Sequence, residues 1–216
     1  MNKVWALKGL YAITDASLAS DKDIVTQVEL ALRGGARAIQ YRDKHQDHRQ
    51  KAEEAAALLR LCRTAGVPLI INDDVELAAA IQADGVHLGR DDPNPGEARR
   101  RLGPGAIIGI SCYNRLDLAF RAQAADADYV AFGRFFPSSI KPQAVQAKLD
   151  LLTSARAALK LPIVAIGGIT PENGGPLIAA GADMLAVIHG IFGQADILRA
   201  CQDFNKLFEE TEASHP

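Results

Sequence analysis

Short apolar runs recur along the chain, and each is followed by a longer segment in which apolar residues recur with a helical period. The runs have the length of buried strands and cover residues 10–14, 38–41, 69–71, 85–88, 107–110, 129–132, 163–166 and 185–188. Each run is continuously apolar rather than apolar at every second position, as expected for strands covered on both faces. This pattern predicts a sheet of parallel strands with helices packed on it.

The segments between the runs are predicted to be amphipathic helices. In the first of them, residues 23–33, the side chains of Ile24, Val28 and Leu32 fall on one face, and Gly34 ends the helix. The other predicted helices cover residues 47–64, 75–81, 97–102, 116–125, 143–159, 171–181 and 195–210. Residues 211–216 are polar, and we expect them to form a frayed tail.

The strict alternation of eight strands with helices predicts the α/β fold class, as a single (β/α)8 TIM barrel that spans residues 1–216 as one domain. Small residues precede every second strand, at residues 34–36, 83–85, 125–128 and 180–183. A repeat of two units favours a closed barrel. The alternative is an open flavodoxin-like or Rossmann sheet, but no G-x-G-x-x-G follows the first strand to support it.

The composition and charge of the chain indicate which kinds of molecule the protein binds. The net charge of −2 and the isoelectric point of about 6.2 argue against nucleic-acid binding. The longest apolar run, residues 161–169, is too short to span a bilayer, and no apolar signal core precedes Asp15. The three cysteines lack metal-binding spacing and fit the reducing cytoplasm. We therefore expect a cytoplasmic protein that acts on small molecules.

Polar residues gather immediately after the predicted strands, whereas glycine, alanine and proline dominate before them. The residues after the strands are Asp15, Arg42, Lys44, Asn72, Asp73, Asp74, Arg90, Asp91, Asp92, Ser111, Arg134, Ser138, Ser139, Lys141, Gly167, Gly168, His189 and Gly190. In barrel enzymes the chemistry takes place at the carboxyl ends of the strands. This asymmetry is the strongest indication of a site.

The segment after the sixth strand is long for a strand-to-helix connection, and long loops in compact domains are commonly functional. It carries Arg134, which we expect to be an exposed cation, and Ser138, Ser139 and Lys141, which can donate to an anion. Gly167-Gly168 follows the next strand, and glycines there let backbone N–H groups approach a phosphate. The alternatives are a solvated surface loop and plain tight turns.

Asp73 and Asp92 end adjacent predicted strands, and the cations Arg42, Lys44 and Lys141 follow other strands at the same end of the barrel. One or two carboxylates together with substrate phosphate oxygens are typical ligands of Mg²⁺. The alternative is helix capping, by Asp74 and by Asp91 or Asp92. His87 lies within the fourth strand, where a hydrogen-bonded core histidine is the favoured interpretation. Cys112 is interpreted as a small buried side chain.

Seven stretches, taken in order, resemble the thiamine-phosphate synthases, the enzymes that join the pyrimidine and thiazole halves of thiamine. They are YAITD at 11–15, QYRDK at 40–44, IINDD at 70–74, DGVHLG at 84–89 with Asp92 after it, GIS at 109–111, YVAFGRFFPSSIK at 129–141 and VAIGGI at 164–169. They span nearly the whole chain. The resemblance implies a (β/α)8 barrel that condenses hydroxymethylpyrimidine diphosphate with thiazole phosphate, or its carboxylated form, and releases diphosphate.

The resemblance also implies roles for single residues. The pyrimidine diphosphate would be held by Gln40, Tyr41, Arg42, Asp43, Lys44, Asn72, Ser111 and Lys141, and the thiazole phosphate by Ser138, Ser139, Ile140, Gly168, Ile188 and His189. Asp73 and Asp92 would bind the Mg²⁺ cofactor. Lys141, Arg42 and Ser111 are expected to be catalytic, with cations stabilising the departing diphosphate.

Three positions depart from the family pattern. The usual T-x-T-K is Ser138-Ser139-Ile140-Lys141, the usual serine near the end of the eighth strand is His189, and the frequent histidine two residues after Ser111 is Tyr113. Two alternative functions remain open at this point. One is a thiazole tautomerase of the same fold, with His189 as its acid or base. The other is a non-catalytic sensor of a phosphorylated ligand.

Overall fold

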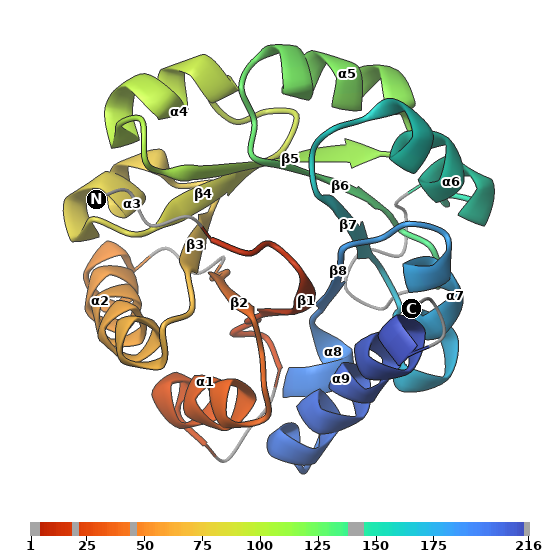
Figure 1. The fold of residues 1–216 in the computed structure, drawn as a ribbon. Coiled ribbons are helices and arrows are strands. Elements are labelled where there is room, and N and C mark those ends of the chain that lie inside the picture. Colours follow the sequence, from red (N-terminus) through yellow and green to blue (C-terminus); the bar gives the residue numbers. More distant parts are fainter. Residues whose placement is uncertain (1–4, 19–21, 44–46, 138–144, 214–216) are drawn as a thin grey trace.

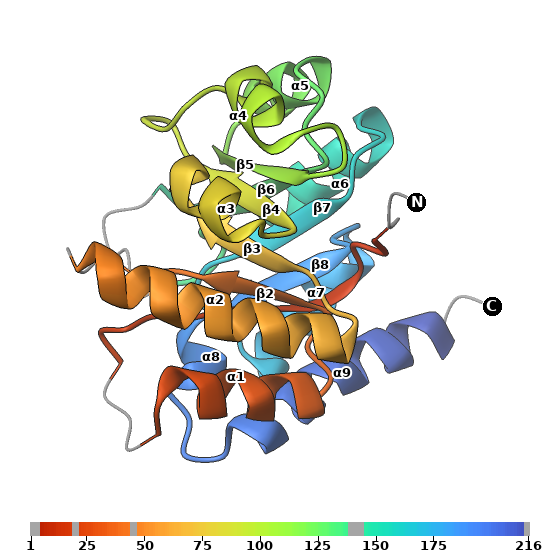
Figure 2. The same ribbon diagram turned by 90° about the vertical axis from the view of Figure 1, so that its left-hand side faces the viewer.

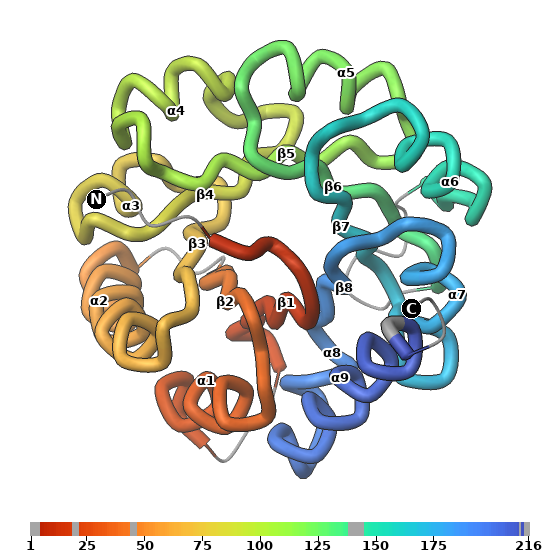
Figure 3. The backbone as a smooth tube through the Cα atoms, in the orientation of Figure 1, coloured from red at the N-terminus to blue at the C-terminus, as the bar shows by residue number. Residues whose placement is uncertain are grey.

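The computed structural model describes residues 5–18, 22–43, 47–137 and 145–213. In this part of the chain eight parallel strands form a closed barrel in the order β1 to β8, and the last strand pairs with the first (Figure 1). The strands are β1 (Gly9–Ile13), β2 (Ala38–Tyr41), β3 (Leu69–Asn72), β4 (Gly85–Leu88), β5 (Ile107–Tyr113), β6 (Tyr129–Gly133), β7 (Ile163–Ile166) and β8 (Met184–Val187). The predicted barrel is confirmed, and the tube in Figure 3 shows β1 between β2 and β8.

A ring of helices surrounds the barrel (Figures 1 and 2). Within the described residues these are α1 (Ile24–Arg33), α2 (His48–Ala65), α3 (Val75–Ile81), α4 (Pro95–Leu102), α5 (Leu116–Ala124), α6 (Leu149–Ala158), α7 (Pro171–Ala179), α8 (His189–Phe192) and α9 (Ile197–Ala213). None of them is long and apolar enough to cross a membrane, over the residues that the structure covers.

The buried apolar side chains lie in two layers because successive strand residues point to opposite faces of the sheet, and a smaller third cluster at β4 and β5 contains Val86, Leu88 and Ile108. The larger core lies between the sheet and the helices and contains residues such as Leu10, Ile39 and Phe132. The inner core lies inside the barrel and contains Tyr11 and Tyr129. The polar Gln40 and His87 are also buried, on strands that line the barrel. Polar groups inside the barrel therefore need partners there.

Side-chain caps define where several helices begin. The Asp47 side chain accepts hydrogen bonds from the backbone N–H groups of Arg49 and Gln50 at the start of α2. Asp74 caps α3 in the same way, which confirms the capping interpretation for this residue. The cap of α4 is Asn94, in a capping box with Glu97, so neither Asp91 nor Asp92 caps a described helix.

Three predicted boundaries are wrong. The helix expected from residue 143 begins only at Leu149, because the backbone of Val145 and Ala147 bonds with that of Arg134. Strand β5 extends beyond Ile110 to Tyr113, with a register shift between Ser111 and Tyr113. At the carboxyl end, α9 continues to Ala213, three residues into the segment expected to be frayed.

Candidate functional site

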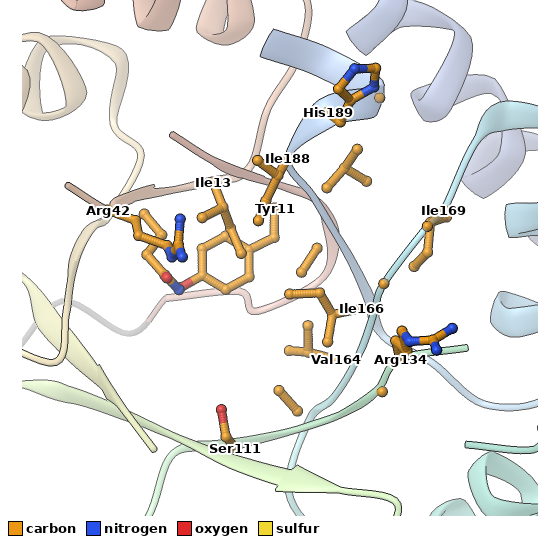
Figure 4. A pocket seen from close by; sticks show the side chains of 18 of the residues that line it. Tyr11, Ile13, Arg42, Ser111, Arg134, Val164, Ile166, Ile169, Ile188 and His189 are labelled. Atoms are coloured by element: carbon orange, nitrogen blue, oxygen red, sulfur yellow. The ribbon is translucent and has the colours of Figure 1, made fainter. Parts of the chain in front are cut away.

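A cavity of about 370 Å³ opens at the carboxyl ends of the strands (Figure 4). All eight strands, or the residues directly after them, contribute to its lining. Arg42 and Tyr11 lie on one side of the cavity and Arg134 and Ile169 lie on the other, with Ser111 below. The position agrees with the site predicted from the polar residues that follow the strands.

The structure brings most of the predicted site residues together. Those that line the cavity are Gln40, Arg42, Asn72, Asp73, Ser111, Gly168, Ile188 and His189. Tyr41, Asp43 and Asp92 are described but do not line it. Lys44, Ser138, Ser139, Ile140 and Lys141 lie outside the described residues, so the predictions for them stay predictions.

Arg42 is held in place by the two residues that directly follow Ile13, the last residue of β1. Its Nη1 donates to Asp15 Oδ2 at 2.7 Å, and its backbone N–H donates to Thr14 Oγ1 at 2.9 Å. Burial opposes ionisation of Asp15, but hydrogen bonds from Ser17 and the Arg42 guanidinium lower the pKa of this carboxyl. The cavity therefore contains a fixed cation, supported by a carboxylate that stays ionised.

The side chains of Gln40 and Tyr41 point to opposite faces of the sheet because the two are consecutive residues of one strand. Gln40 faces the barrel interior, where its Nε2 donates to the Tyr11 hydroxyl at 2.8 Å. Tyr41 faces the helices, and its hydroxyl donates to Glu54 Oε2 on α2 at 2.8 Å. Burial, together with the Glu54 and Asp43 carboxylates, raises the pKa of Tyr41. The Tyr41 side chain is thus turned away from the cavity, which corrects its predicted place among side chains that hold substrate.

A row of hydrogen bonds crosses the barrel interior, and we refer to it as the interior network. It begins with the bond from Gln40 to Tyr11 and continues between the Tyr11 and Tyr129 hydroxyls at 2.9 Å. His87 Nδ1 lies 2.9 Å from the Tyr129 hydroxyl, and His87 Nε2 lies 2.9 Å from Ser111 Oγ. Burial raises the pKa of both tyrosines, so their hydroxyls stay protonated. His87 is a buried, hydrogen-bonded histidine, as interpreted from the sequence, but it also lines the cavity.

The two predicted metal ligands take different places at the rim. Asp73 lines the cavity directly after β3 with a left-handed backbone, φ 63°. Asp92 Oδ2 accepts a hydrogen bond from the backbone N–H of Gly89, a cavity residue, at 2.6 Å. The guanidinium carbon of Arg90 lies 5.0 Å from the centre of the Tyr113 ring, which also lines the cavity. Carboxylates and a cation thus meet beside the ends of β3 to β5.

This donor set fits Mg²⁺ when a substrate supplies further oxygens. Among the described residues there is no group of three or more His, Cys, Asp or Glu side chains that could hold a metal. Magnesium commonly takes only one or two protein carboxylates and completes its shell with water and phosphate oxygens. Asp73 and Asp92 are the described carboxylates that suit this role.

The opposite side of the cavity is built from glycines packed against the segment after β6. A Cβ on Gly167 would overlap Arg134, and one on Gly168 would overlap the Pro137 backbone. Both glycines have positive φ values, 105° and 64°, which favour glycine. Arg134 is partly buried and lines the cavity, which corrects the prediction of an exposed cation.

His189 is the first residue of α8 and lies beyond Ile188 in Figure 4. A Cβ on Gly193 would come within 2.9 Å of the His189 ring, so the imidazole packs against the end of the same helix. Cys62, Cys112 and Cys201 are all buried free thiols. Burial is the main reason that the pKa of each thiol is raised to about 12. The interpretation of Cys112 as a small buried residue is confirmed.

Prediction from the sequence missed four cavity residues of chemical interest: Tyr11, His87, Thr170 and Gln194. Tyr11 belongs to an apolar run, and its contacts come from strands distant in sequence. Thr170 and Gln194 lie just beyond the glycines and the histidine that were singled out. Thr170 is two residues beyond Gly168 and Gln194 is four beyond Gly190, so a longer window after each strand would have found both.

The chain matches the family model described as thiamine monophosphate synthase over residues 10–191. It is 52% identical to the thiamine-phosphate synthase of Nitrosococcus oceani over 211 residues, which covers 98% of this chain and 97% of that protein. It is also 52% identical to the thiamine-phosphate synthase of Thiobacillus denitrificans over 200 residues, covering 93% and 94%. A solved thiamine phosphate pyrophosphorylase from Pyrococcus furiosus superposes with a TM-score of 0.87 at 36% identity, covering 95% of this chain and 97% of that one.

Proposed function

The chain belongs to the thiamine monophosphate synthase family, and we propose that its barrel cavity is where the two halves of thiamine are joined. The protein is a transferase of thiamine biosynthesis. It condenses 4-amino-2-methyl-5-hydroxymethylpyrimidine diphosphate with thiazole phosphate to give thiamine phosphate and diphosphate. Its substrates are small molecules. The carboxylated thiazole phosphate is a second candidate for the acceptor.

The pyrimidine diphosphate binds at the ends of β2 to β5 in this proposal. The observation that carries the assignment is the Arg42 guanidinium, which Asp15 fixes at 2.7 Å and which belongs to a residue that lines the cavity, as Asn72 does. A fixed guanidinium is a suitable donor to a diphosphate oxygen because it cannot lose its charge. Gln40 and Ser111 lie deeper, where they can hydrogen-bond the pyrimidine ring.

Asp73 and Asp92 are the residues that would hold Mg²⁺. Bound there, the ion would supply positive charge to the diphosphate group. Lys44 and Lys141, by their resemblance to the family pattern, would add cations at the same end. Because Asp73 lines the cavity and Asp92 is bonded to a lining residue, both carboxylates are close to the place that we assign to the diphosphate.

The thiazole phosphate binds on the opposite side, near Gly168, Ile188 and His189. Gly167 and Gly168 have no side chains to block the approach of an anion to the backbone. Arg134 packs against Gly167 and adds a positive charge on this side of the cavity. Ser138, Ser139 and Ile140 complete this subsite in the family pattern.

The reaction needs no nucleophile from the protein. The bond between the pyrimidine methylene carbon and the diphosphate oxygen breaks, and the electron pair leaves with the diphosphate. The thiazole nitrogen then donates its lone pair to that carbon. Arg42 stabilises the charge that develops on the leaving group, and Ser111 and Gln40 orient the ring. A site with fixed cations on one side and an anion subsite on the other suits this sequence of events.

A coupled assay tests the proposal. Purified protein with both substrates and Mg²⁺ is expected to form thiamine phosphate and diphosphate in equal amounts. The Arg42→Gln variant should lose about 10²- to 10³-fold in turnover, whereas Arg115→Gln, in an exposed ion pair, should not. Isomerisation of the thiazole phosphate without product would instead indicate a tautomerase. Binding of both ligands without any turnover would indicate a sensor.

We place the protein in the cytoplasm. The support is its three buried free thiols, which suit a reducing compartment, and substrates that are phosphorylated metabolites.

A further inference from the structure

The number of donors and acceptors in the interior network determines which group donates in each of its hydrogen bonds. Gln40 Nε2 can only donate, so the Tyr11 oxygen accepts from it at 2.8 Å. Each tyrosine hydroxyl then has one proton to place. Tyr11 is 1% exposed and Tyr129 is 0% exposed, so neither proton can be given to bulk water.

If Tyr11 donates to Tyr129, every proton in the row has an acceptor. Tyr129 then donates to His87 Nδ1, and the ring carries its own proton on Nε2, which donates to Ser111 Oγ at 2.9 Å. In the reverse direction Tyr129 donates to Tyr11, and His87 Nδ1 donates to Tyr129. The Tyr11 oxygen then accepts twice, and its own buried proton has no acceptor among the hydrogen bonds of the described residues. An unmade buried hydrogen bond is costly, so the first direction is the stable one.

We propose that His87 is a positioning residue: held as the Nε2–H tautomer by the two tyrosines, it donates to Ser111 and turns the Ser111 hydroxyl proton into the cavity. Ser111 lines the cavity, whereas Tyr129 supports the ring from outside it. The His87 and Tyr129 rings are also stacked, with centroids 5.5 Å apart, which fixes the plane of the imidazole. The inference rests on the proposed function in one respect, that the acceptor for this proton is the pyrimidine substrate.

The tautomer can be measured on the free protein by ¹⁵N NMR. Nitrogen-15 correlations of the histidine rings distinguish Nδ1–H, Nε2–H and the doubly protonated ring, and the signals of His87 are those missing from the His87→Asn spectrum. We expect a protonated Nε2 and an unprotonated Nδ1, and a mixture of tautomers in Tyr129→Phe. An Nδ1–H or doubly protonated ring in the wild-type protein would overturn the proposal. This measurement needs no activity, so it succeeds or fails independently of the proposed function.

Two substitutions separate positioning from packing. A Gln amide at position 87 reaches the place of Nε2 and can still donate to Ser111, whereas an Asn amide reaches only the place of Nδ1. We expect His87→Asn to lower kcat/KM for the pyrimidine diphosphate about tenfold, with KM for the thiazole phosphate unchanged. His87→Gln should stay within about threefold of wild type. Equal losses in both variants, or losses that follow the melting temperature, would indicate packing alone.

The last arm asks whether His87 acts through Ser111. In a Ser111→Ala background, His87→Asn should cause no further loss in kcat/KM, because the hydroxyl that it orients is absent. A repeated tenfold loss in that background would show that His87 acts on the substrate by another path and would overturn the assignment.

Discussion

The carboxylate of Asp15 lies 2.7 Å from the guanidinium of Arg42, and the two side chains are only 8% and 11% exposed. The pair joins the end of β1 to the end of β2. It leaves Arg42 facing the cavity while Asp15 lies behind it. The cation that we assign to the leaving diphosphate is therefore positioned before any substrate binds, which lowers the cost of arranging it during the reaction.

Replacing Asp15 by Asn tests this pair. The fold lowers the pKa of Asp15, so its ionised form contributes to stability at pH values above the unfolded pKa of about 3.9. That contribution is lost as the pH falls through the lower, folded pKa. We expect Asp15→Asn to reduce the free energy of unfolding by about 1.5–3 kcal/mol near pH 7. The difference from wild type should shrink below about pH 4.

Urea unfolding at pH 3 to 8 measures this difference. Asp117→Asn is the matched control, because Asp117 pairs with Arg115 on the surface and should matter little. A stability difference that grows on acidification would contradict the assigned sign. Asp15→Asn should also raise KM for the pyrimidine diphosphate, since the Arg42 guanidinium loses its fixed position.

The metal assignment predicts that Asp73→Asn and Asp92→Asn each lower turnover by about 10²- to 10³-fold, as expected when stabilisation of the leaving group is lost. Asn tolerates the left-handed backbone at position 73, so the melting temperature of the Asp73→Asn variant should hardly change. Asp91→Asn is the control, an exposed neighbour with the same chemistry. Full activity of the wild type in excess chelator would remove the metal from the reaction.

The Tyr129 ring leaves no room for a side chain at Gly109. The two residues are paired in register between β5 and β6, and a Cβ on Gly109 would overlap the tyrosine ring. We expect Gly109→Ala to lower the free energy of unfolding by about 1–3 kcal/mol, the usual cost of overpacking. In a Tyr129→Ala background the ring is absent, and the same substitution should cost much less. An equal cost in both backgrounds, measured by urea unfolding, would show that the ring is not the obstacle.

Two adjacent glycines of α7 should respond in opposite ways to alanine. A Cβ on Gly175 would meet nothing within 4 Å, so Gly175→Ala should stabilise the protein by about 0.5–1 kcal/mol through helix propensity. A Cβ on Gly174 would come within 2.9 Å of Leu185 and Leu207, so Gly174→Ala should destabilise it. Thermal melting of the two variants beside wild type tests this contrast, and melting temperatures shifted in the same direction would contradict it.

The fold was predictable because the information is local. Each strand is an apolar run that ends in glycine or a polar residue, and each helix has a regular apolar face. The errors arose where distant backbone decides the structure. Val145 and Ala147 lie outside the helix because they bond to Arg134, and β5 continues to Tyr113 because β6 pairs with it beyond a bulge. Neither partner is visible in the local pattern.

The site was predictable in its position and in most of its polar residues, and less so in how they are held. Alternation along β2 could have separated Gln40 from Tyr41, since only one of two consecutive residues can face the interior. Apart from Ser111, the members of the interior network give no local signal, because each of them lies in an apolar run. Its bonds join β1, β2, β4, β5 and β6, and they follow only from the closure of the barrel.

The closure of the barrel also determines at which point of protein synthesis the binding site forms. The ring of strands is completed only by the pairing of β8 with β1, where Tyr11 lies beside Ala186, and both residues line the cavity. A nascent chain that has not yet released β8 from the ribosome has an open sheet with two unpaired edges and an incomplete cavity. The ability to bind either substrate is therefore gained in a single late event, after nearly the whole polypeptide has been translated.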